Sequence, residues 1–384
     1  MRQNKRIPWK TIGLTLAAAL AGAALGYWLM SQLAPLGLWG LAGGLALLVL
    51  AYVLQVVVHE GGHLVCGLLT GYRALSFRIG RMLLVKLDGR WKLRAYHIPG
   101  TGGQCLMAPP AQEHPPYRLY HLGGGLANLL LSLLALPVFF LAGSPLVRVF
   151  AGALVLLGIW MAGTNLIPMR LGGVANDGYN AKNLGKDPLA LQCSCVQLWI
   201  VEALQEGYSL AGMPEEWFDL PPKADLQNVL IMGTAIQRAS RLMARGELEE
   251  ADQAIRALLR GGHELLGLHR LELTCEEIYC ALVLGRVREA ERLFTPEVRR
   301  YCRQTWKYCP ARVRQAYAWA LLAERDVEKA RDLRAEFERA AARYPYSGEL
   351  AGERALLDRA DSAAEISSTG KKKADGLSHK VEKF

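Results

Sequence analysis

Apolar residues form four long runs before about residue 170, whereas in the second half of the chain they recur every three to four positions. The runs cover about residues 11–30, 38–69, 119–142 and 146–168. A helix needs about 20 mostly apolar residues to cross a bilayer, and a period near 3.6 is typical of amphipathic helices around a soluble core. The pattern therefore predicts a mostly α-helical membrane protein with about four transmembrane helices, followed by a soluble helical domain.

The same pattern predicts four parts. Residues 1–37 hold a basic N-terminus and the first span, residues 38–219 the other three spans, residues 220–360 the helical domain, and residues 361–384 a basic tail. The first run is long for the core of a cleaved signal peptide and lacks a polar cleavage region, which favours a retained helix. The tail is poor in apolar residues, a composition typical of disorder.

Charge adds an orientation. The chain carries a formal charge of +10, with basic residues gathered at both ends and between residues 71 and 118. Because Lys and Arg mark the cytoplasmic side of a span, we expect the N-terminus, the 71–118 segment and everything after about 170 to be cytoplasmic, as in a multi-pass protein of a bacterial cell membrane. A basic chain can also bind nucleic acid, but no recognition motif accompanies the charge, so we expect lipid and protein partners and no nucleic acid.

Eight cysteines are present, and none has the paired spacing of a structural zinc site. Most lie in segments predicted to be cytoplasmic, where disulfides are uncommon. We interpret them as reduced thiols.

The 71–118 segment has the alternation of a β-hairpin, with strands 75–87 and 91–98 around a turn at Asp88-Gly89. Such a hairpin can pair by its edge with an extended substrate, or it can lie at the headgroups with its basic residues on anionic lipid. Both interpretations stay open. Residues 98–110 are predicted to be a flexible, partly apolar gate.

Three ionisable residues, His59, Glu60 and His63, interrupt the second apolar run in the sequence HEGGH. Histidines at positions i and i+4 share a helix face and can hold one Zn²⁺, while the glutamate can serve as general base toward water. The alternative is a histidine pair hydrogen-bonded inside a helix bundle. That alternative must account for three groups that are costly at membrane depth, so the pattern favours zinc.

Two histidines leave such a site short of one ligand, because catalytic zinc usually takes three protein ligands and a water. Asp177 is the leading candidate, since it lies in an Asn-Asp-Gly turn just after the fourth run. Asp-Gly pairs also occur simply as turns. Asp187 and His121 are rivals for the third position.

At these positions the chain resembles a known family. HEGGH, followed by the Asn-Leu-Ile-Pro sequence at residues 165–168 and by Asp-Gly at residues 177–178, resembles the site-2 protease family of intramembrane zinc metalloproteases, the peptidase M50-like proteins. The GGGLAN sequence at residues 123–128 also resembles the glycine-x-x-asparagine element of that family. The resemblance covers roughly residues 38–180.

The resemblance implies a set of roles, with zinc ligands His59, His63 and Asp177, general base Glu60, and Asn128 and Asn165 as polar groups near the substrate or oxyanion. One spacing departs from the family pattern, because nine positions separate Pro168 from Asp177. The two glycines between them predict a loop.

The implied function is that of an enzyme, a zinc metalloendopeptidase that hydrolyses membrane-embedded or membrane-adjacent protein or peptide substrates near the cytoplasmic face. One alternative is a catalytically inactive membrane scaffold whose helical domain binds a partner protein. Another is a small-solute transporter, which would usually bring more spans and internal repeats in the membrane half.

The helical domain contains a faint repeat. Gly246, Gly285 and Arg325 occupy one register, and an alanine follows each of them five residues later. An apolar helix precedes each of these positions and an amphipathic one follows it. Such pairs resemble tetratricopeptide-like α-solenoids, whose concave surface suits a cytoplasmic protein partner. Helices that only cap the membrane domain are the alternative.

Overall fold

A computed structural model describes residues 9–87, 89–96, 102–112, 114–171, 174–262, 265–306 and 308–381. The chain divides into two compact units. The first comprises Met1–Val65 and His121–Ile167, and the second comprises Cys66–Tyr120 and Pro168–Phe384. The boundary expected near residue 220 therefore lies inside the second unit.

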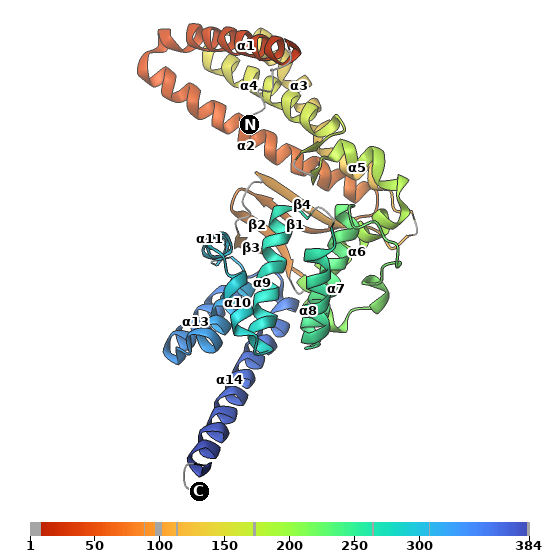
Figure 1. The fold of residues 1–384 in the computed structure, drawn as a ribbon. Coiled ribbons are helices and arrows are strands. Elements are labelled where there is room, and N and C mark those ends of the chain that lie inside the picture. The colour runs from red at the N-terminus through yellow and green to blue at the C-terminus, as the bar shows by residue number, and fades with distance from the viewer. Residues whose placement is uncertain are drawn as a thin grey trace. The chain divides into compact units, whose positions relative to one another are not determined.

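Four helices correspond to the four apolar runs (Figure 1): α1 (Trp9–Leu33), α2 (Gly37–Leu69), α3 (Tyr117–Leu141) and α4 (Pro145–Leu166). A short 3₁₀ turn, η1 (Ala34–Leu36), joins α1 to α2. Within the described residues, three helical stretches are long and apolar enough to cross a membrane, namely Gly22–Leu69, Tyr117–Leu141 and Pro145–Leu166. The first stretch includes residues of both α1 and α2, so the count of four spans stays a prediction.

Small residues let the helices of the first unit approach closely. A Cβ atom built on Gly62 of α2 would lie 2.2 Å from the carbonyl oxygen of Gly123 in α3. Buried alanines continue the contact, with Ala51 on α2, Ala135 on α3 and Ala153 on α4 in one apolar cluster. Such residues are typical of helix interfaces in membranes, because they let backbones meet without a side chain between them.

The predicted hairpin is part of a larger antiparallel sheet in the second unit, of order β3-β2-β1-β4. Its strands are β1 (Arg73–Ile79), β2 (Met82–Leu87), β3 (Arg90–Ala95) and β4 (Gly103–Ala108). The expected single strand 75–87 is wrong, because Gly80 adopts a φ of 56° and turns the chain between β1 and β2. The expected gate 98–110 is also wrong for residues 103–108, which pair with β1. Asp88 and residues 97–101 lie outside the described residues.

The hairpin of β2 and β3 has two different faces. Leu83, Val85 and Leu87 are buried in one cluster, whereas Leu84 and its cross-strand neighbour Leu93 are exposed. The exposed face is apolar although it is open to solvent. It is therefore suited to contact lipid or another chain.

Beyond residue 168 the second unit holds a short two-stranded ribbon, β5 (Arg170–Leu171) and β6 (Val174–Ala175), and then only helices. Its longer helices are α5 (Asp177–Asn183), α6 (Pro188–Gln205), α7 (Val229–Ala244), α8 (Leu248–Arg260), α9 (Gly267–Val283), α10 (Val287–Leu293), α11 (Pro296–Thr305), α12 (Pro310–Ala318), α13 (Val327–Ala341) and α14 (Ser347–Val381). Short 3₁₀ turns lie at Leu184–Lys186, Leu210–Gly212 and Glu215–Trp217, and a π-helical turn, Trp319–Glu324, follows α12.

The predicted repeat register is visible in the backbone. Gly246, Gly285 and Arg325 all have positive φ, at 77°, 77° and 59°, and each lies between two helices of a pair. Among the described residues, Arg325 is the one non-glycine position with this conformation. The alanines five residues later are buried in the largest apolar cluster of the unit. The three helix pairs therefore turn in the same way.

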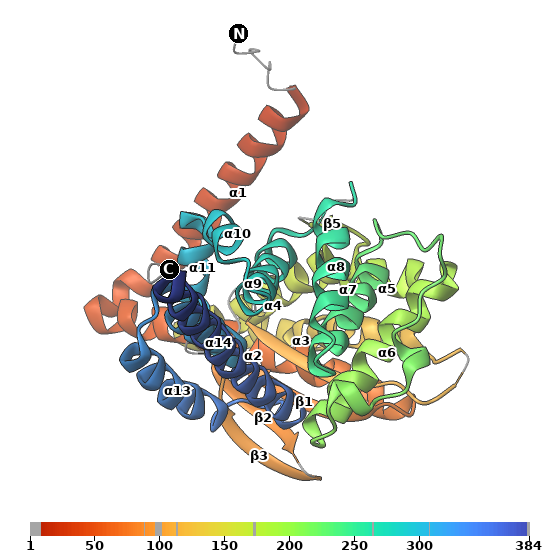
Figure 2. The same ribbon diagram turned by 60° about the horizontal axis from the view of Figure 1, so that its bottom comes forward.

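The tail differs from the expectation. Instead of ending near residue 360, α14 runs to Val381 as one long helix (Figure 2). At the start of the predicted tail, Asp361 accepts hydrogen bonds from the hydroxyl of Tyr317 and from Nη1 of Arg334. The prediction of disorder from residue 361 is therefore wrong around Asp361, because these tertiary contacts outweigh the polar composition of the segment.

Candidate metal centre

His59, Glu60 and His63 lie on the later part of α2, and all three are buried, with 7–8 % of their surface exposed. The helical spacing places the two imidazoles on one face. Their Nε2 atoms lie 3.2 Å apart, and the ring planes are nearly perpendicular at 84°. At this distance one nitrogen can donate a hydrogen to the other, and two nitrogens that ligate one zinc ion would lie at a similar spacing.

An amide chain fixes the proton of His59. Its Nδ1 lies 2.7 Å from Oδ1 of Asn128, and a carbonyl oxygen can only accept. The orientation of the Asn128 amide is set by its Nδ2, which donates to the backbone oxygen of Gln55 at 2.9 Å and to Oε1 of Gln55 at 2.6 Å. His59 therefore carries its hydrogen on Nδ1, and the lone pair of its Nε2 faces Nε2 of His63.

The chain of amides continues to α4. Nε2 of Gln55 donates to the backbone oxygen of Leu154 at 2.7 Å, and the hydroxyl of Ser132 donates to the backbone oxygen of Asn128 at 2.9 Å. Gln55, Asn128 and Ser132 are all buried, at 0 to 3 % exposure. Because this network satisfies its polar groups inside an apolar unit, it holds α2, α3 and α4 in one register around His59.

Two glycines leave room for the imidazoles and the amides. A Cβ atom on Gly124 of α3 would lie 2.5 Å from Nε2 of His63 and 2.7 Å from Cε1 of His59. A Cβ atom on Gly158 of α4 would lie 2.4 Å from Nε2 of Gln55. Any side chain at either position would displace these polar groups.

Asp177 is placed by a small ribbon. The eight residues between Pro168 and Asp177 include β5 and β6, which pair with each other. The ends of this interval are tied together because the amide of Asn176 donates to the backbone oxygen of Met169 at 3.1 Å. Oδ1 of Asn176 also accepts from the amides of Met169 and Tyr179, which makes it the N-cap of α5. The ribbon thus takes up the extra residues, and Asp177 begins a helix beside Met169.

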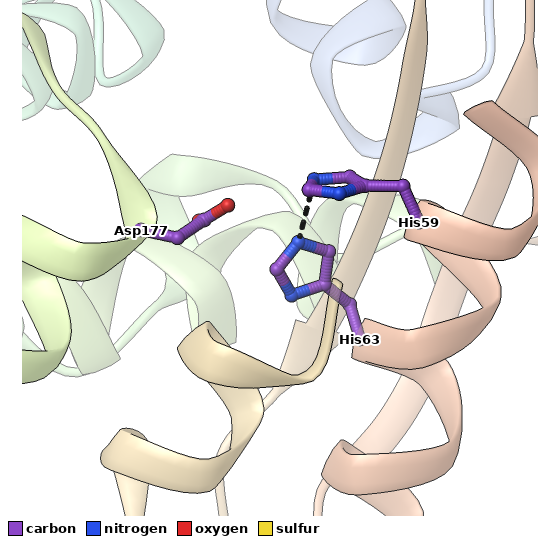
Figure 3. Close-up of side chains that lie close together, drawn as sticks. All are labelled: His59, His63 and Asp177. Carbon is purple, nitrogen blue, oxygen red and sulfur yellow. Dashed lines mark hydrogen bonds between the residues drawn. The ribbon is translucent and has the colours of Figure 1, made fainter. Parts of the chain in front are cut away.

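The structure brings together one ligand atom from each of His59, His63 and Asp177, and these atoms all lie within 4.8 Å of one another (Figure 3). Three atoms that each lie about 2.0–2.2 Å from one zinc ion are at most about 4.4 Å apart. Bonding to a single ion of that size would therefore draw the three ligand atoms closer together. Two imidazoles and one carboxylate are also a usual ligand set for catalytic zinc, so donor chemistry and the space left by Gly124 both fit.

The other expected residues have different places. Nδ2 of Asn165 donates to the backbone oxygen of Met161 one turn earlier, which ties this amide to its own helix. Asp187 accepts from the amide of Ala190 and from Nδ2 of Asn228, so it is the N-cap of α6. Asn128 is fully buried and both hydrogens of its amide face Gln55, so it supports His59 and has no donor left for a substrate oxygen.

Sequence reasoning did not single out Gln55, Gly124 and Gly158. A signal for Gln55 was present, because it is a polar residue four positions before His59 in the same apolar run. Gly124 lies inside the GGGLAN sequence, but which of its three glycines faces the histidines depends on the packing of α2 against α3. Gly158 has no local signal, since glycine is common in transmembrane helices.

Comparison with known proteins gives one family. The sequence model described as Peptidase family M50 matches residues 46–332. This range includes both histidines, Asp177, the sheet and most of the helical domain. No curated protein and no solved structure matches the chain.

Proposed function

The chain belongs to peptidase family M50, and from that premise we propose that it is an intramembrane zinc metalloprotease. The observation that carries the proposal is the convergence of His59, His63 and Asp177, two histidines one turn apart on a transmembrane helix and a carboxylate held by its own ribbon. The alternative, a catalytically inactive scaffold, was supported by the unusual spacing between Pro168 and Asp177. The ribbon of β5 and β6 takes up that spacing, so we favour the enzyme.

His59 would bind zinc through Nε2, because Asn128 holds its hydrogen on Nδ1. His63 would use the nitrogen that faces it, and Asp177 would supply one carboxylate oxygen and offset part of the positive charge. Bound there, zinc would act as a Lewis acid toward a peptide carbonyl and lower the pKa of water.

Glu60 is the residue that we assign to proton transfer. It directly follows His59, in the turn between the two histidines, and is 8 % exposed, so bulk water does not compete for its carboxylate. In this role it takes a proton from the attacking water and returns it to the leaving amine. Turnover thus requires a carboxylate at this position, whereas metal binding does not.

The substrate class follows from the surroundings of the site. Two of the ligands, His59 and His63, lie on a helix apolar enough to cross a membrane, and the flanking basic residues favour a site near the cytoplasmic face. We therefore propose peptide bonds in membrane-embedded or membrane-adjacent segments as substrates. A helical segment must unwind first, and an extended strand could then pair with a sheet edge, either β3 or β4. The exposed apolar face of β2 and β3 equally suits the headgroup region.

For the helical domain we propose a tetratricopeptide-like role, in which the stacked pairs α7/α8, α9/α10 and α12/α13 bind a cytoplasmic protein partner. The common left-handed turn at Gly246, Gly285 and Arg325 supports this proposal. A domain that recognises a partner and shares its chain with a protease would select which substrates reach that protease.

Metal content and turnover together test the proposal. Zinc per chain should be measured in detergent-purified wild type, His59→Ala, Asp177→Ala and Glu60→Gln. We expect about one zinc in wild type and in Glu60→Gln, and loss or weakening in the other two, because catalytic zinc is held by three protein ligands. With a set of fluorogenic transmembrane peptides in micelles, Glu60→Gln should lower cleavage by about 10²–10⁴-fold.

Each outcome separates one part of the proposal. Zinc lost in His59→Ala but retained at full affinity in Asp177→Ala would leave an enzyme with a different third ligand. Full cleavage by Glu60→Gln would overturn the assigned base. A wild type that binds no zinc even when zinc is supplied would overturn the metalloprotease.

A further inference from the structure

The helical domain contains a cavity of about 260 Å³. It lies between α7, α9, α12 and α14, far along the chain from the metal ligands. Its apolar wall includes Leu204, Ile236, Met243 and Leu273, and its polar wall holds two arginines and four glutamates, namely Arg312, Arg314, Glu272, Glu276, Glu349 and Glu353. Pockets for drug-sized ligands begin at about 300 Å³, so this one is of a size for a single long side chain.

Part of this charge is internally paired. Glu276 on α9 receives Nη2 of both Arg312 and Arg314 from α12, one on each carboxylate oxygen. Although burial opposes it, the two guanidiniums lower the pKa of the Glu276 carboxyl. Nε of Arg314 donates to Glu353 at 2.7 Å, and its guanidinium lies 4.2 Å from the ring centre of Tyr279. These contacts fix the arginines in place.

Some N–H donors of the two arginines remain without an acceptor. Nη1 of Arg314 and Nε of Arg312 are buried without a hydrogen-bond partner, in side chains that are 1 % and 4 % exposed. An unpaired buried N–H of a charged group costs free energy. Both side chains line the cavity, so a small shift of either guanidinium would bring these N–H groups to an acceptor that enters it and would relieve this cost.

Two of the glutamates remain without a positively charged partner. Among the described residues, Glu349 and Glu272 have no salt-bridge partner, and each receives one tyrosine hydroxyl, from Tyr344 at 2.6 Å and from Tyr301 at 3.1 Å. Burial, together with the charges of Glu353 and Glu272, raises the pKa of Glu349 to about 7, although part of its surface reaches solvent. With four carboxylates facing two guanidiniums, the wall lacks positive charge.

We propose that this cavity binds a basic side chain of a peptide, with the cationic end at Glu349 and a neighbouring backbone carbonyl at the free N–H groups of Arg314 and Arg312. A peptide supplies both groups a short distance apart, and the aliphatic stem of a lysine would cover Leu204 and Met243. A simple amine lacks the acceptor, and an anion would meet four carboxylates. This site does not depend on the metal centre.

The test uses the full-length protein in detergent and isothermal titration with an acetylated, amidated Ala-Ala-Lys-Ala-Ala peptide. We expect binding to wild type, and about tenfold or greater weakening when norleucine replaces lysine, because the stem remains and the charge is lost. Glu349→Gln should weaken the lysine peptide similarly, while a glutamine can still accept from Tyr344.

Two further variants test whether the peptide binds in this cavity. Gly352→Leu fills the cavity, since a Cβ atom at Gly352 has its nearest neighbour, Ala244, at 3.6 Å, and it should abolish binding. Glu336→Gln is the matched control, because Glu336 pairs with Arg339 on α13 and does not line the cavity. It should bind the peptide as wild type does.

The proposal would be overturned by a wild type that does not bind the lysine peptide, by equal binding of the norleucine peptide, or by full binding in Glu349→Gln or Gly352→Leu. Free lysine that binds as tightly as the peptide would overturn the assignment of a peptide ligand. Zinc content in Glu349→Gln should equal that of wild type, so failure here is separate from failure of the metalloprotease.

Discussion

The two units bury polar groups in opposite ways. In the first unit, Gln55, Asn128 and Ser132 are uncharged, and they form one chain that ends on His59. In the second unit, Arg312 and Arg314 are charged and nearly inaccessible, and their pairing with glutamates leaves N–H groups over. Amides cost less to bury and can be fully satisfied, so they serve to orient a neighbour. Buried charged groups attract one another strongly, but their hydrogen-bond donors and acceptors are rarely all paired. The unpaired ones can then bind a ligand.

The largest effect should come from breaking the charged network. Glu276→Gln leaves two buried guanidiniums opposite a neutral amide, and we expect the free energy of unfolding to fall by about 3–5 kcal/mol. Denaturant or thermal unfolding in detergent measures this change. The exposed-side control Glu336→Gln should stay within about 0.5 kcal/mol of wild type. A loss below about 1 kcal/mol in Glu276→Gln would mean that solvent already screens the network.

The amide network should show its effect in metal affinity more than in stability. Gln55→Leu frees the Asn128 amide to rotate, so Nδ1 of His59 loses its fixed acceptor, and we expect zinc affinity to fall by about 10–100-fold. Competition with a chelator measures the affinity. Ser31→Ala, which removes an exposed hydroxyl on α1, is the control. Unchanged affinity in Gln55→Leu would show that Asn128 is held without it.

The smallest effect concerns pH. A network of amides does not titrate near neutrality, whereas burial raises the pKa of Glu349 to about 7. The folded state then holds a proton that the unfolded state releases above its ordinary pKa, so stability should fall as pH rises from about 5 through 7.

Glu349→Gln should flatten this slope by about 1 kcal/mol, less than the full shift would give because solvent reaches part of the group. Melting temperatures at pH 5.5 and 8 measure it. An equal slope in wild type and variant would assign the pH dependence to other groups.

Local patterns predicted much of the centre. The i, i+4 spacing of His59 and His63 needs nothing beyond a helix, whereas the two glycines before Asp177 lie outside the described residues, and the residues on either side of them pair as β5 and β6. The register of Gly246, Gly285 and Arg325 was visible as a repeat, and the backbone turns alike at all three. Arg325 adopts a conformation that costs a non-glycine residue about 1–2 kcal/mol, so the register is imposed by packing more strongly than by the residue itself.

Features that depend on contacts between distant segments were not predictable. Strand β4 follows a glycine-rich stretch and becomes a strand only because β1 offers it an edge. Asn128 was expected near the substrate or oxyanion, but its hydrogen-bond partner Gln55, 73 residues away in sequence, could not be predicted. The chain from residue 361 onward reads as a polar tail until Tyr317 and Arg334 are placed beside Asp361.

The length of α2 has a consequence of its own. Its 33 residues span about 50 Å at 1.5 Å per residue, whereas the hydrocarbon layer of a bilayer is about 30 Å thick. The usual tilt of up to about 40° cannot hide this excess, so one end of the helix must leave the lipid. HEGGH occupies the later end. Bilayer thickness would therefore decide how deeply the histidines sit, and lipids with shorter acyl chains would expose them to more water without any change in the protein.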